Sequence, residues 1–495
     1  MDSFPLFLVV THFLNILLLT LLARSGLEVL SALPRLYASD DCPPGRELVR
    51  FSRRVVGADS RQAWTSLELE APWSPVIALP GHKNLGIGRH WHFMTLQFWI
   101  LTGVVYVVLL CLSGQWIRLV PTSWSIVPGA MHALAVYFNG HLAPPQPGLV
   151  YNAAQQLAYF TVVFLLAPLQ IATGAAMSPS VIARFPWYGR LFGGKQMART
   201  LHFLGLCAFG AFVVVHTIMV VLHGLPREWA AIALGSYRAN RAVAVAVGLA
   251  ALLVIVAVNV AVTVWALASP RSAQRLTGRL VDPFESALSK ILTSRQRYRR
   301  AGITPYHWVN GRPPSDTGYR EMARGGFRDY RLEIGGLVDS PRTLTLEQLR
   351  ELGCESQVTK HNCIQGWTGI AEWGGVPLRK IVELVRPHEG AQRIVFYAYD
   401  DKGLTEGEGR YGQYYGSIPL HLALKPQTIL ALEMNGEPLP IEHGAPVRLR
   451  VETQLGFKMV KWIRKIEFTE GYEQLGAGMG GWREDQQYYA NAAGI

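Results

Sequence analysis

The sequence predicts an all-α transmembrane helix bundle of about five spans, joined to a soluble α+β domain. Residues 1–270 contain five apolar runs of about 20 residues, the length that a helix needs to cross the hydrocarbon core of a bilayer. Residues 304–495 are instead charged, rich in turn residues and alternate between apolar and polar positions. Between these domains, residues 271–303 form a basic stretch that indicates a linker at the membrane surface, with a short amphipathic segment near 281–292.

The expected spans lie at about 4–23, 92–113, 151–176, 202–223 and 243–268. The first run has neither the basic start nor the small-residue cleavage site of a signal peptide, so we expect it to remain as a span. A polar insert at about 24–89 separates the first two spans. Five runs of this kind predict a multi-pass protein of the inner (cytoplasmic) membrane, with the lipid bilayer as a partner.

The formal net charge of +12 would also suit a nucleic-acid-binding protein. The positions of the basic residues argue against that function, because most of them lie on one side of the bundle. The segments after the first, third and fifth spans carry Arg35, Arg46, Arg50, Arg53, Arg54, Arg184, Lys195, Arg199, Arg271, Arg275 and Arg279. The opposite side carries little beyond Arg118, Arg227, Arg238 and Arg241. The positive-inside rule therefore predicts that the richer side, and with it the soluble half, is cytoplasmic.

Histidines lie at matching depths in the membrane half. His202 and His216 are 14 residues apart on the fourth span, which places them roughly 21 Å apart along one face of a helix. The first span runs antiparallel to the fourth, so His12 near its start is level with His216. The second span runs parallel to the fourth, so the histidine at its start is level with His202. We choose His92 for this position, and His90 is the alternative.

Two histidine pairs, one near each membrane surface, are what two bis-imidazole b-type haems require. The iron ligands would be His12 with His216, and His92 with His202. For any one of these histidines the alternative is a buried imidazole bonded to a backbone carbonyl, but four at consistent depths favour haem. A structural role is expected for three histidines near span ends or in a loop, His132, His141 and His223.

On these histidines and their spacing, residues 5–270 resemble the cytochrome b subunits of nickel-iron hydrogenases and formate dehydrogenases. The segment AMSPSVIARFPW, followed by FGGKQMARTLHF, is also similar to bacterial cytochrome b domains found beside other redox modules. The resemblance implies two haems and exchange of electrons with quinone or quinol. The insert at about 24–89 departs from the shorter subunits, so no quinone site is transferred.

The soluble half mixes strands and helices irregularly, which is typical of an α+β fold rather than of a doubly wound sheet. Residues 343–352 predict a helix capped by Thr345. Strands are predicted, from their alternation and β-branched or aromatic content, at 329–338, 393–400, 446–453 and 461–468.

The five cysteines show no zinc-type spacing, and their odd number does not suggest a disulfide framework. We expect Cys354 to be buried in the core. Cys363 follows a strand-like stretch and precedes Gly366 and Gly369, so it lies in a permissive loop. A thiolate there can be a soft metal ligand or a nucleophile.

A basic set further along the chain is suited to a phosphate group, and it consists of His443, Arg448, Lys458 and Lys461. A soft ligand together with a phosphate-binding set predicts a phosphorylated metal cofactor. Residue chemistry alone does not name that cofactor.

Three ordered blocks, HNCIQGWTGIAEWGGVPL, MNGEPLPIEHGAPVRLRV and GFKMVKWI, resemble the sulfite oxidase family of molybdopterin enzymes over about residues 305–470. Within that family they look most similar to the catalytic subunit of bacterial methionine sulfoxide reductase systems. The resemblance implies a soluble domain of the sulfite oxidase molybdopterin-binding type. It makes Cys363 the catalytic residue and the thiolate ligand of molybdenum. It also implies a set of cofactor contacts, Asn310, His443, Arg448, Met459, Val460 and Lys461.

Two departures from the family affect function. Sulfite oxidases carry arginines shortly after the cysteine, whereas Ile364-Gln365-Gly366-Trp367 follows here, so sulfite is not the favoured substrate. The reductase subunit is exported by a twin-arginine signal. We expect none here, because no apolar region follows Ser52-Arg53-Arg54, and this agrees with a cytoplasmic soluble half.

These features predict a membrane-bound molybdopterin-dependent oxidoreductase. Oxygen-atom transfer to or from a small-molecule substrate at molybdenum would exchange electrons with the quinone pool through two b-type haems. The direction of the reaction stays open. The alternative is a haem electron-relay protein whose soluble half is a non-catalytic binding module for a partner. No nucleic-acid partner is expected, and the oligomeric state is not predicted.

Overall fold

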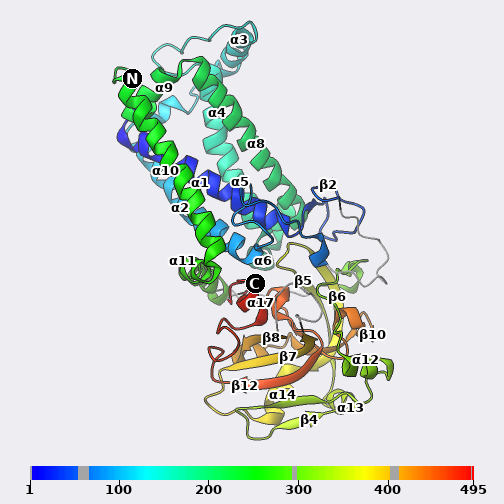
Figure 1. The fold of residues 1–495 in the computed structure, drawn as a ribbon. Coiled ribbons are helices and arrows are strands. Elements are labelled where there is room, and N and C mark those ends of the chain that lie inside the picture. Colours follow the sequence, from blue (N-terminus) through cyan, green and yellow to red (C-terminus); the bar gives the residue numbers. More distant parts are fainter. Residues whose placement is uncertain (1–2, 54–65, 292–297, 402–411, 492) are drawn as a thin grey trace.

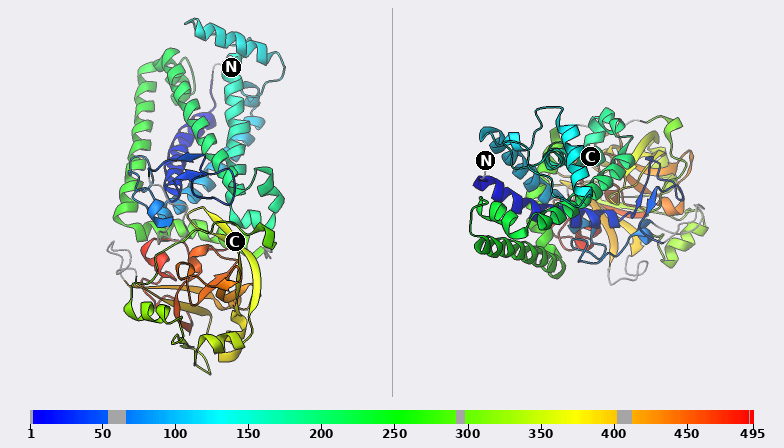
Figure 2. Two further views of the ribbon diagram at one scale, coloured as in Figure 1. Left: turned by 90° about the vertical axis from the view of Figure 1, so that its right-hand side faces the viewer. Right: turned by 90° about the horizontal axis from the view of Figure 1, so that it is seen from above.

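The computed structural model describes residues 3–53, 66–291, 298–401, 412–491 and 493–495. A bundle of long helices stands on a β-rich domain, and the chain's last residues lie where the two meet (Figure 1). Figure 2 shows the same two-part arrangement from the side. The predicted fold class, a transmembrane helix bundle with a soluble α+β domain, is confirmed.

Within the described residues, five helical segments are long and apolar enough to cross a membrane, which confirms the multi-pass prediction. They are α1 (Leu6–Ser31), α2 (Leu85–Leu112), the combined α4–α5 segment (Ala153–Met177), α8 (Lys195–Leu222) and α10 (Arg241–Ala268). At the end nearer the soluble domain, α1, α2 and α8 continue roughly two turns beyond the predicted runs. Hydropathy marks only the part of a helix that matches lipid, and polar residues such as Arg24, Glu28 and Arg199 extend these helices past it.

The third span is irregular. It consists of α4 (Ala153–Phe160), a π-helical segment η3 (Thr161–Leu166) and α5 (Ala167–Met177). Proline at position 168 has no backbone N–H, and the N–H of Ala167 bonds back to the carbonyl of Val162. The proline accounts for the wider turn at this point, because it cannot continue an α-helical hydrogen-bond ladder.

Shorter helices occupy the two ends of the bundle. The end away from the soluble domain holds α3 (Ile126–Phe138) and α9 (Leu225–Leu234) (Figure 1). The other end holds α6 (Pro179–Arg184), α7 (Pro186–Leu191) and α11 (Pro270–Ile291). The amphipathic segment expected near 281–292 is therefore part of a longer helix that begins directly after α10. The described parts of the insert between α1 and α2, residues 32–53 and 66–84, contain β1 (Arg35–Leu36), β2 (Val49–Arg50) and the 3-10 turn η1 (Ser66–Leu69).

The soluble domain contains two five-stranded sheets that are antiparallel except for the parallel pair β3–β12. In one sheet the order is β10-β9-β6-β5, with β11 also paired to β9; in the other it is β4-β3-β12-β7-β8. The first consists of β5 (Glu355–Asn362), β6 (Thr368–Pro377), β9 (Thr428–Met434), β10 (Glu437–Pro438) and β11 (Arg448–Val451). The second consists of β3 (Leu332–Gly336), β4 (Arg342–Leu344), β7 (Arg393–Asp401), β8 (Gln413–Pro419) and β12 (Ile463–Thr469).

One apolar core joins the two sheets, with Ile334, Phe396 and Ile466 from one and Leu430 and Leu449 from the other. The helices of the soluble domain include α12 (Thr317–Arg324), α13 (Leu346–Glu351), α14 (Leu378–Val385), α16 (Leu420–Ala423) and α17 (Trp482–Gln486). All four predicted strands are present. Thr345 caps α13 as predicted, because its side chain accepts a hydrogen bond from the backbone of Gln348 while the Gln348 side chain accepts one in return.

Polar contacts tie the soluble domain to the bundle. Lys360 Nζ lies 2.8 Å from Asp40 Oδ2 of the insert. On the other side of the interface, Gln274 Nε2 donates to the carbonyl of Tyr489 at 2.8 Å, and Ser180 Oγ donates to that of Gly494 at 3.1 Å. The C-terminal residues therefore lie between the membrane helices and the sheets.

Candidate functional site

The four histidines chosen from the sequence meet in two pairs inside the bundle. The ring centres of His12 and His216 are 6.3 Å apart, and those of His92 and His202 are 6.5 Å apart. Two imidazoles that bind one iron from opposite faces through metal–nitrogen bonds of about 2 Å place their ring centres roughly 6–7 Å apart. The spacing of both pairs fits a bis-imidazole haem.

Hydroxyl groups set the tautomer of the pair nearer the soluble domain. Ser25 Oγ lies 3.1 Å from His92 Nδ1, and Thr173 Oγ1 lies 3.0 Å from His202 Nδ1. Each hydroxyl donates its one hydrogen to a backbone carbonyl four residues earlier, that of Leu21 at 2.7 Å or of Leu169 at 2.8 Å. The histidine Nδ1 atoms must therefore be the donors, which leaves each Nε2 lone pair for a metal.

His90 lies on a different side of α2 from His92. It is buried, and a Cβ atom at Gly278 of α11 would lie 3.6 Å from its Cε1 atom. Neither of its ring nitrogens has a hydrogen-bond partner among the described residues. The geometry pairs His92, and not His90, with His202.

Cys363 begins the loop between β5 and β6. Its backbone N–H donates to the carbonyl of Trp367 at 3.0 Å, and the N–H of Gly366 donates to the carbonyl of Cys363 at 3.1 Å. Gly366 has a φ of +116°, which only glycine adopts without strain. Burial raises the pKa of the Cys363 thiol to about 11. A metal that binds this sulfur would have to displace its proton.

The loop is packed on both sides. Cys363 shares an apolar cluster with Trp308 and Trp367 of the soluble domain and with residues of the membrane half, Leu33, Tyr37, Cys42 and Leu69. Two polar side chains reach the sulfur, since Asn310 Nδ2 lies 3.5 Å and Gln365 Oε1 lies 3.6 Å from Sγ.

In contrast, Cys354, which we expected to be buried, is exposed where the chain enters β5, so that prediction is wrong.

A cavity opens beside this loop and is lined mainly by basic and aromatic side chains. Its lining includes three residues that flank Cys363, namely Trp308, Asn310 and Trp367, although Cys363 itself is not part of it. The other side chains that line it include His307, His361, Asp400, Tyr414, His443, Arg448, Met459, Lys461, Trp462 and Arg483. The cavity thus gathers most of the residues predicted to contact a cofactor.

Burial shifts the pKa values of several groups that line the cavity. The pKa of His307 is lowered to about 3, first by burial and then by Arg448 and Arg450. Burial also lowers the pKa of Arg448, and the nearby Arg450 guanidinium adds to this effect. Both arginines come from β11 at positions two apart, so they share a face, and both stack on Trp373. Arg450 already pairs with the buried carboxylate of Glu452, so Arg448 is the cation of the two that favours an anionic ligand.

The chemistry of this cavity fits a phosphorylated pterin cofactor. His307 Nε2 and Arg448 Nε are buried without a hydrogen-bond partner among the described residues. Lys461 Nζ donates to the carbonyl of Glu442 at 2.8 Å beside the cavity. His307 Nδ1 faces the carbonyl of Trp308 at 3.3 Å, so its Nε2 is an acceptor, whereas Arg448 Nε and Lys461 Nζ are donors. The donors suit a phosphate, and the acceptor suits an N–H group of a polar heterocycle.

Two predicted basic or cofactor residues lie elsewhere. The side chain of Val460 is part of the sheet core and does not line the cavity. Lys458 is buried in an ion pair with Glu484 and also donates to Asn491 Oδ1 at 2.6 Å. The phosphate-binding set expected from the sequence therefore lacks Lys458.

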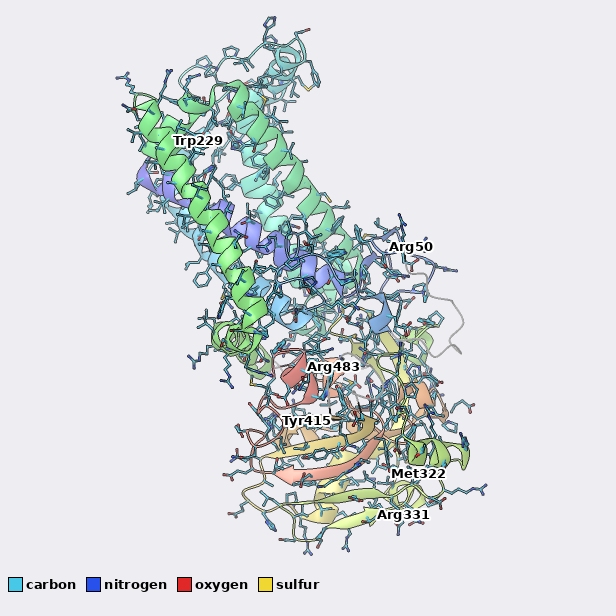
Figure 3. All side chains as sticks on the ribbon, viewed as in Figure 1. Arg50, Trp229, Met322, Arg331, Tyr415 and Arg483 are labelled. Carbon is cyan, nitrogen blue, oxygen red and sulfur yellow. The ribbon has the colours of Figure 1, made fainter. Side chains whose placement is uncertain are left out.

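Several residues of the cavity were missed by sequence reasoning. His361 stands two residues before Cys363, so a local signal existed for it. Arg450 does not line the cavity but acts on the pKa of His307, and it repeats Arg448 at the strand period. Arg483 had no such signal, because α17 lies more than 100 residues from the Cys363 loop in the chain. It is labelled in Figure 3, at the face of the soluble domain that meets the bundle.

Helix α8 connects the two kinds of site. Near its start, Gln196 Nε2 donates to the carbonyl of Gly366 in the Cys363 loop at 2.9 Å. Three residues later, Arg199 donates to the carbonyls of Arg35 and Leu33 in the insert. His202 follows six residues after Gln196, or roughly 9 Å along the axis.

Comparison with known proteins assigns both halves. Residues 3–235 match the family model of prokaryotic cytochrome b561, and residues 321–475 match that of the oxidoreductase molybdopterin binding domain. The chain joins a cytochrome b561 domain to a molybdopterin-binding domain. Both resemblances described from the sequence are confirmed at this level.

Relatives of the joined domains include subunits of reductases. The chain is 38% identical over 159 residues to the putative protein-methionine-sulfoxide reductase subunit YedZ1 of Azospira oryzae, covering 32% of this chain and 54% of that protein. It is 29% identical over 148 residues to the protein-methionine-sulfoxide reductase catalytic subunit MsrP of Campylobacter jejuni, covering 29% of this chain and 50% of that protein. The chain thus spans about half the length of these relatives. A solved structure, the sulfane dehydrogenase SoxCD from Paracoccus pantotrophus, is 24% identical over 31% of this chain and 42% of its own, with a TM-score of 0.26.

Proposed function

We propose that this molybdopterin oxidoreductase passes electrons between the quinone pool and a small oxygen-atom-transfer substrate through two b-type haems. The observation that carries the proposal is the course of α8. One helix supplies a histidine to each pair and, at its start, binds the loop of Cys363. Electrons therefore need no second protein between haem and molybdenum.

The cofactor roles follow from the lining of the cavity. Cys363 is the proposed thiolate ligand of molybdenum, and Asn310 lies beside its sulfur. Arg448 and Lys461 are the proposed phosphate contacts, and His443 and Met459, which line the same cavity, are the proposed pterin contacts. For Val460, which was predicted as a contact, only its backbone remains as a candidate. When bound, the cofactor supplies two-electron oxygen-atom transfer, and the protein positions it and excludes water.

The two haems divide the path. The pair His92–His202 lies nearer the soluble domain and exchanges electrons with molybdenum. The pair His12–His216 lies nearer the opposite end. There the ring of Phe212 stacks on that of His216 with ring centres 5.5 Å apart, and the ring centres of Tyr159 and His216 are 6.0 Å apart. Quinone exchange is proposed at this second haem. Reduction of an S-oxide or N-oxide would use two electrons from the haems and two protons, and would release water.

The names of the relatives favour reduction of a sulfoxide, and the test is a substrate screen on the purified protein. Haems reduced with dithionite, with excess reductant removed, are expected to reoxidise on addition of a small sulfoxide or N-oxide. Haem absorbance at its α-band follows this reaction. Metal analysis is expected to give about one molybdenum per chain. Protein that contains haem without molybdenum would instead favour the relay function, with a non-catalytic soluble half.

Topology has its own test. The basic segments of the bundle lie on the side of the soluble domain, so we propose that this domain is cytoplasmic. A reporter that is active only in the cytoplasm, fused after Ile495, is expected to be active. An active periplasmic reporter at the same position would reverse the orientation.

A further inference from the structure

The insert of the cytochrome b561 domain reaches the immediate surroundings of Cys363. Ser66 N–H donates to the carbonyl of Val309 at 2.9 Å, and Ala71 N–H donates to that of Ser31 at 2.9 Å, so this part of the insert is fixed at both ends. Ser66 itself, and Glu70 between the two anchors, both contact Gln365. Gln365 stands two residues after Cys363 and is 3% exposed.

The partners of Gln365 determine which way its amide points. Gln365 Nε2 donates to Glu70 Oε1 at 2.7 Å. Gln365 Oε1 accepts from Ser66 Oγ at 2.7 Å and from Trp367 Nε1 at 3.2 Å. An indole N–H can only donate and an ionised carboxylate can only accept, so the opposite orientation would lose both bonds. The amide oxygen therefore faces Cys363 Sγ, at 3.6 Å.

A second amide beside the sulfur is fixed in the opposite sense. Arg483 Nη2 lies 3.5 Å from Asn310 Oδ1, and a guanidinium can only donate. Asn310 Nδ2 then points to Cys363 Sγ at 3.5 Å. The sulfur thus has one amide donor, from Asn310, and one amide acceptor, from Gln365.

We propose that Glu70 and Ser66 are positioning residues of the molybdenum site, supplied by the membrane half, which hold the Gln365 amide so that no second donor reaches Cys363 Sγ. This inference rests on the proposed function, in which Cys363 is the molybdenum thiolate. Hydrogen bonds to a metal-bound sulfur draw electron density from it and tune the potential of the metal. The insert keeps the sulfur electron-rich and the molybdenum potential low.

The substitution Glu70→Gln tests this arrangement. Glutamine at position 70 can present either its oxygen or its nitrogen, so the Gln365 amide loses its acceptor-only partner and keeps only the donors Ser66 and Trp367 on its oxygen. The less restrained amide can then turn its NH₂ group toward the sulfur in part of the molecules. The expected result is a more positive Mo(VI)/Mo(V) midpoint potential and a changed Mo(V) electron paramagnetic resonance spectrum, with unchanged haem content. Ser66→Ala, which removes one donor to Gln365 Oε1, is expected to produce a smaller change of the same sign.

Glu68→Gln is the matched control. Glu68 lies on the same turn and pairs with Arg312 at 3.0 Å, but both side chains are at least two-fifths exposed. The Mo(V) spectrum and midpoint potential of Glu68→Gln should therefore equal those of the wild type. Molybdenum missing from both Glu70→Gln and Ser66→Ala, with Glu68→Gln fully loaded, would also support a site completed by the insert. Loaded Glu70→Gln and Ser66→Ala with wild-type spectrum and potential would overturn the inference. If the proposed function itself is wrong, the wild-type protein will contain no molybdenum. That result differs from every outcome described for the variants.

Discussion

Replacing Cys363 by alanine is expected to abolish oxide-dependent oxidation of the haems while the reduced haem spectrum stays intact. Loss of groups that only orient metal ligands costs about 10–100-fold, so loss of the proposed thiolate ligand itself should exceed about 100-fold. The haem pairs do not contact this loop, because the nearest link runs through Gln196 and α8. The measurement is the rate of haem reoxidation after addition of the oxide, together with haem and molybdenum content.

Two other cysteines provide controls for this result. Cys354→Ala changes an exposed thiol of the same domain and should leave the rate at the wild-type value. Cys42→Ala changes a buried thiol of the insert that packs in the same cluster as Cys363, so it controls for packing. Turnover that survives in Cys363→Ala, or that disappears equally in Cys42→Ala, would contradict the proposed role of Cys363 as a molybdenum ligand.

The parts of this site that could be predicted from the sequence depend on local order. A helix returns to the same face after about 14 residues, and spans alternate in direction, so the depths of His12, His92, His202 and His216 follow from counting. The Cys363 loop was recognisable because its motif is contiguous. The alternation of the strands made the α+β class accessible in the same way.

Other parts depend on contacts between distant segments. Hydropathy ended α1 about two turns early, because Glu28 and its neighbours lie outside the apolar run but still within the helix. The approach of Glu70 to Gln365 joins residues almost 300 positions apart, and Arg483 reaches Asn310 from α17. The insert was recognised only as a departure from related cytochromes. No periodicity in the chain encodes such meetings, since they are set by how the two domains pack.

Substituting the histidines one at a time is expected to remove the haems one at a time. His202→Ala or His92→Ala should each leave about one haem per chain, and so should His216→Ala or His12→Ala, because an iron that loses one of its two imidazoles is held only weakly. The pyridine haemochrome assay on purified protein measures this content against a wild type that is expected to hold two. His90→Ala, which changes a neighbouring histidine on the same helix, is expected to keep both haems.

The two pairs should differ in what their loss does to electron flow. The haem proposed at His92–His202 would lie between the second haem and Cys363, so its loss should stop reoxidation of the remaining haem by an oxide. Loss of the His12–His216 haem should leave that reaction intact after reduction by dithionite, because the His92–His202 pair, on the side of the bundle nearer the Cys363 loop, is unchanged and α8 is still bonded to that loop. It should stop only reduction by a quinol. Equal effects of His202→Ala and His216→Ala on oxide-driven reoxidation would show that electrons do not pass the two sites in this order.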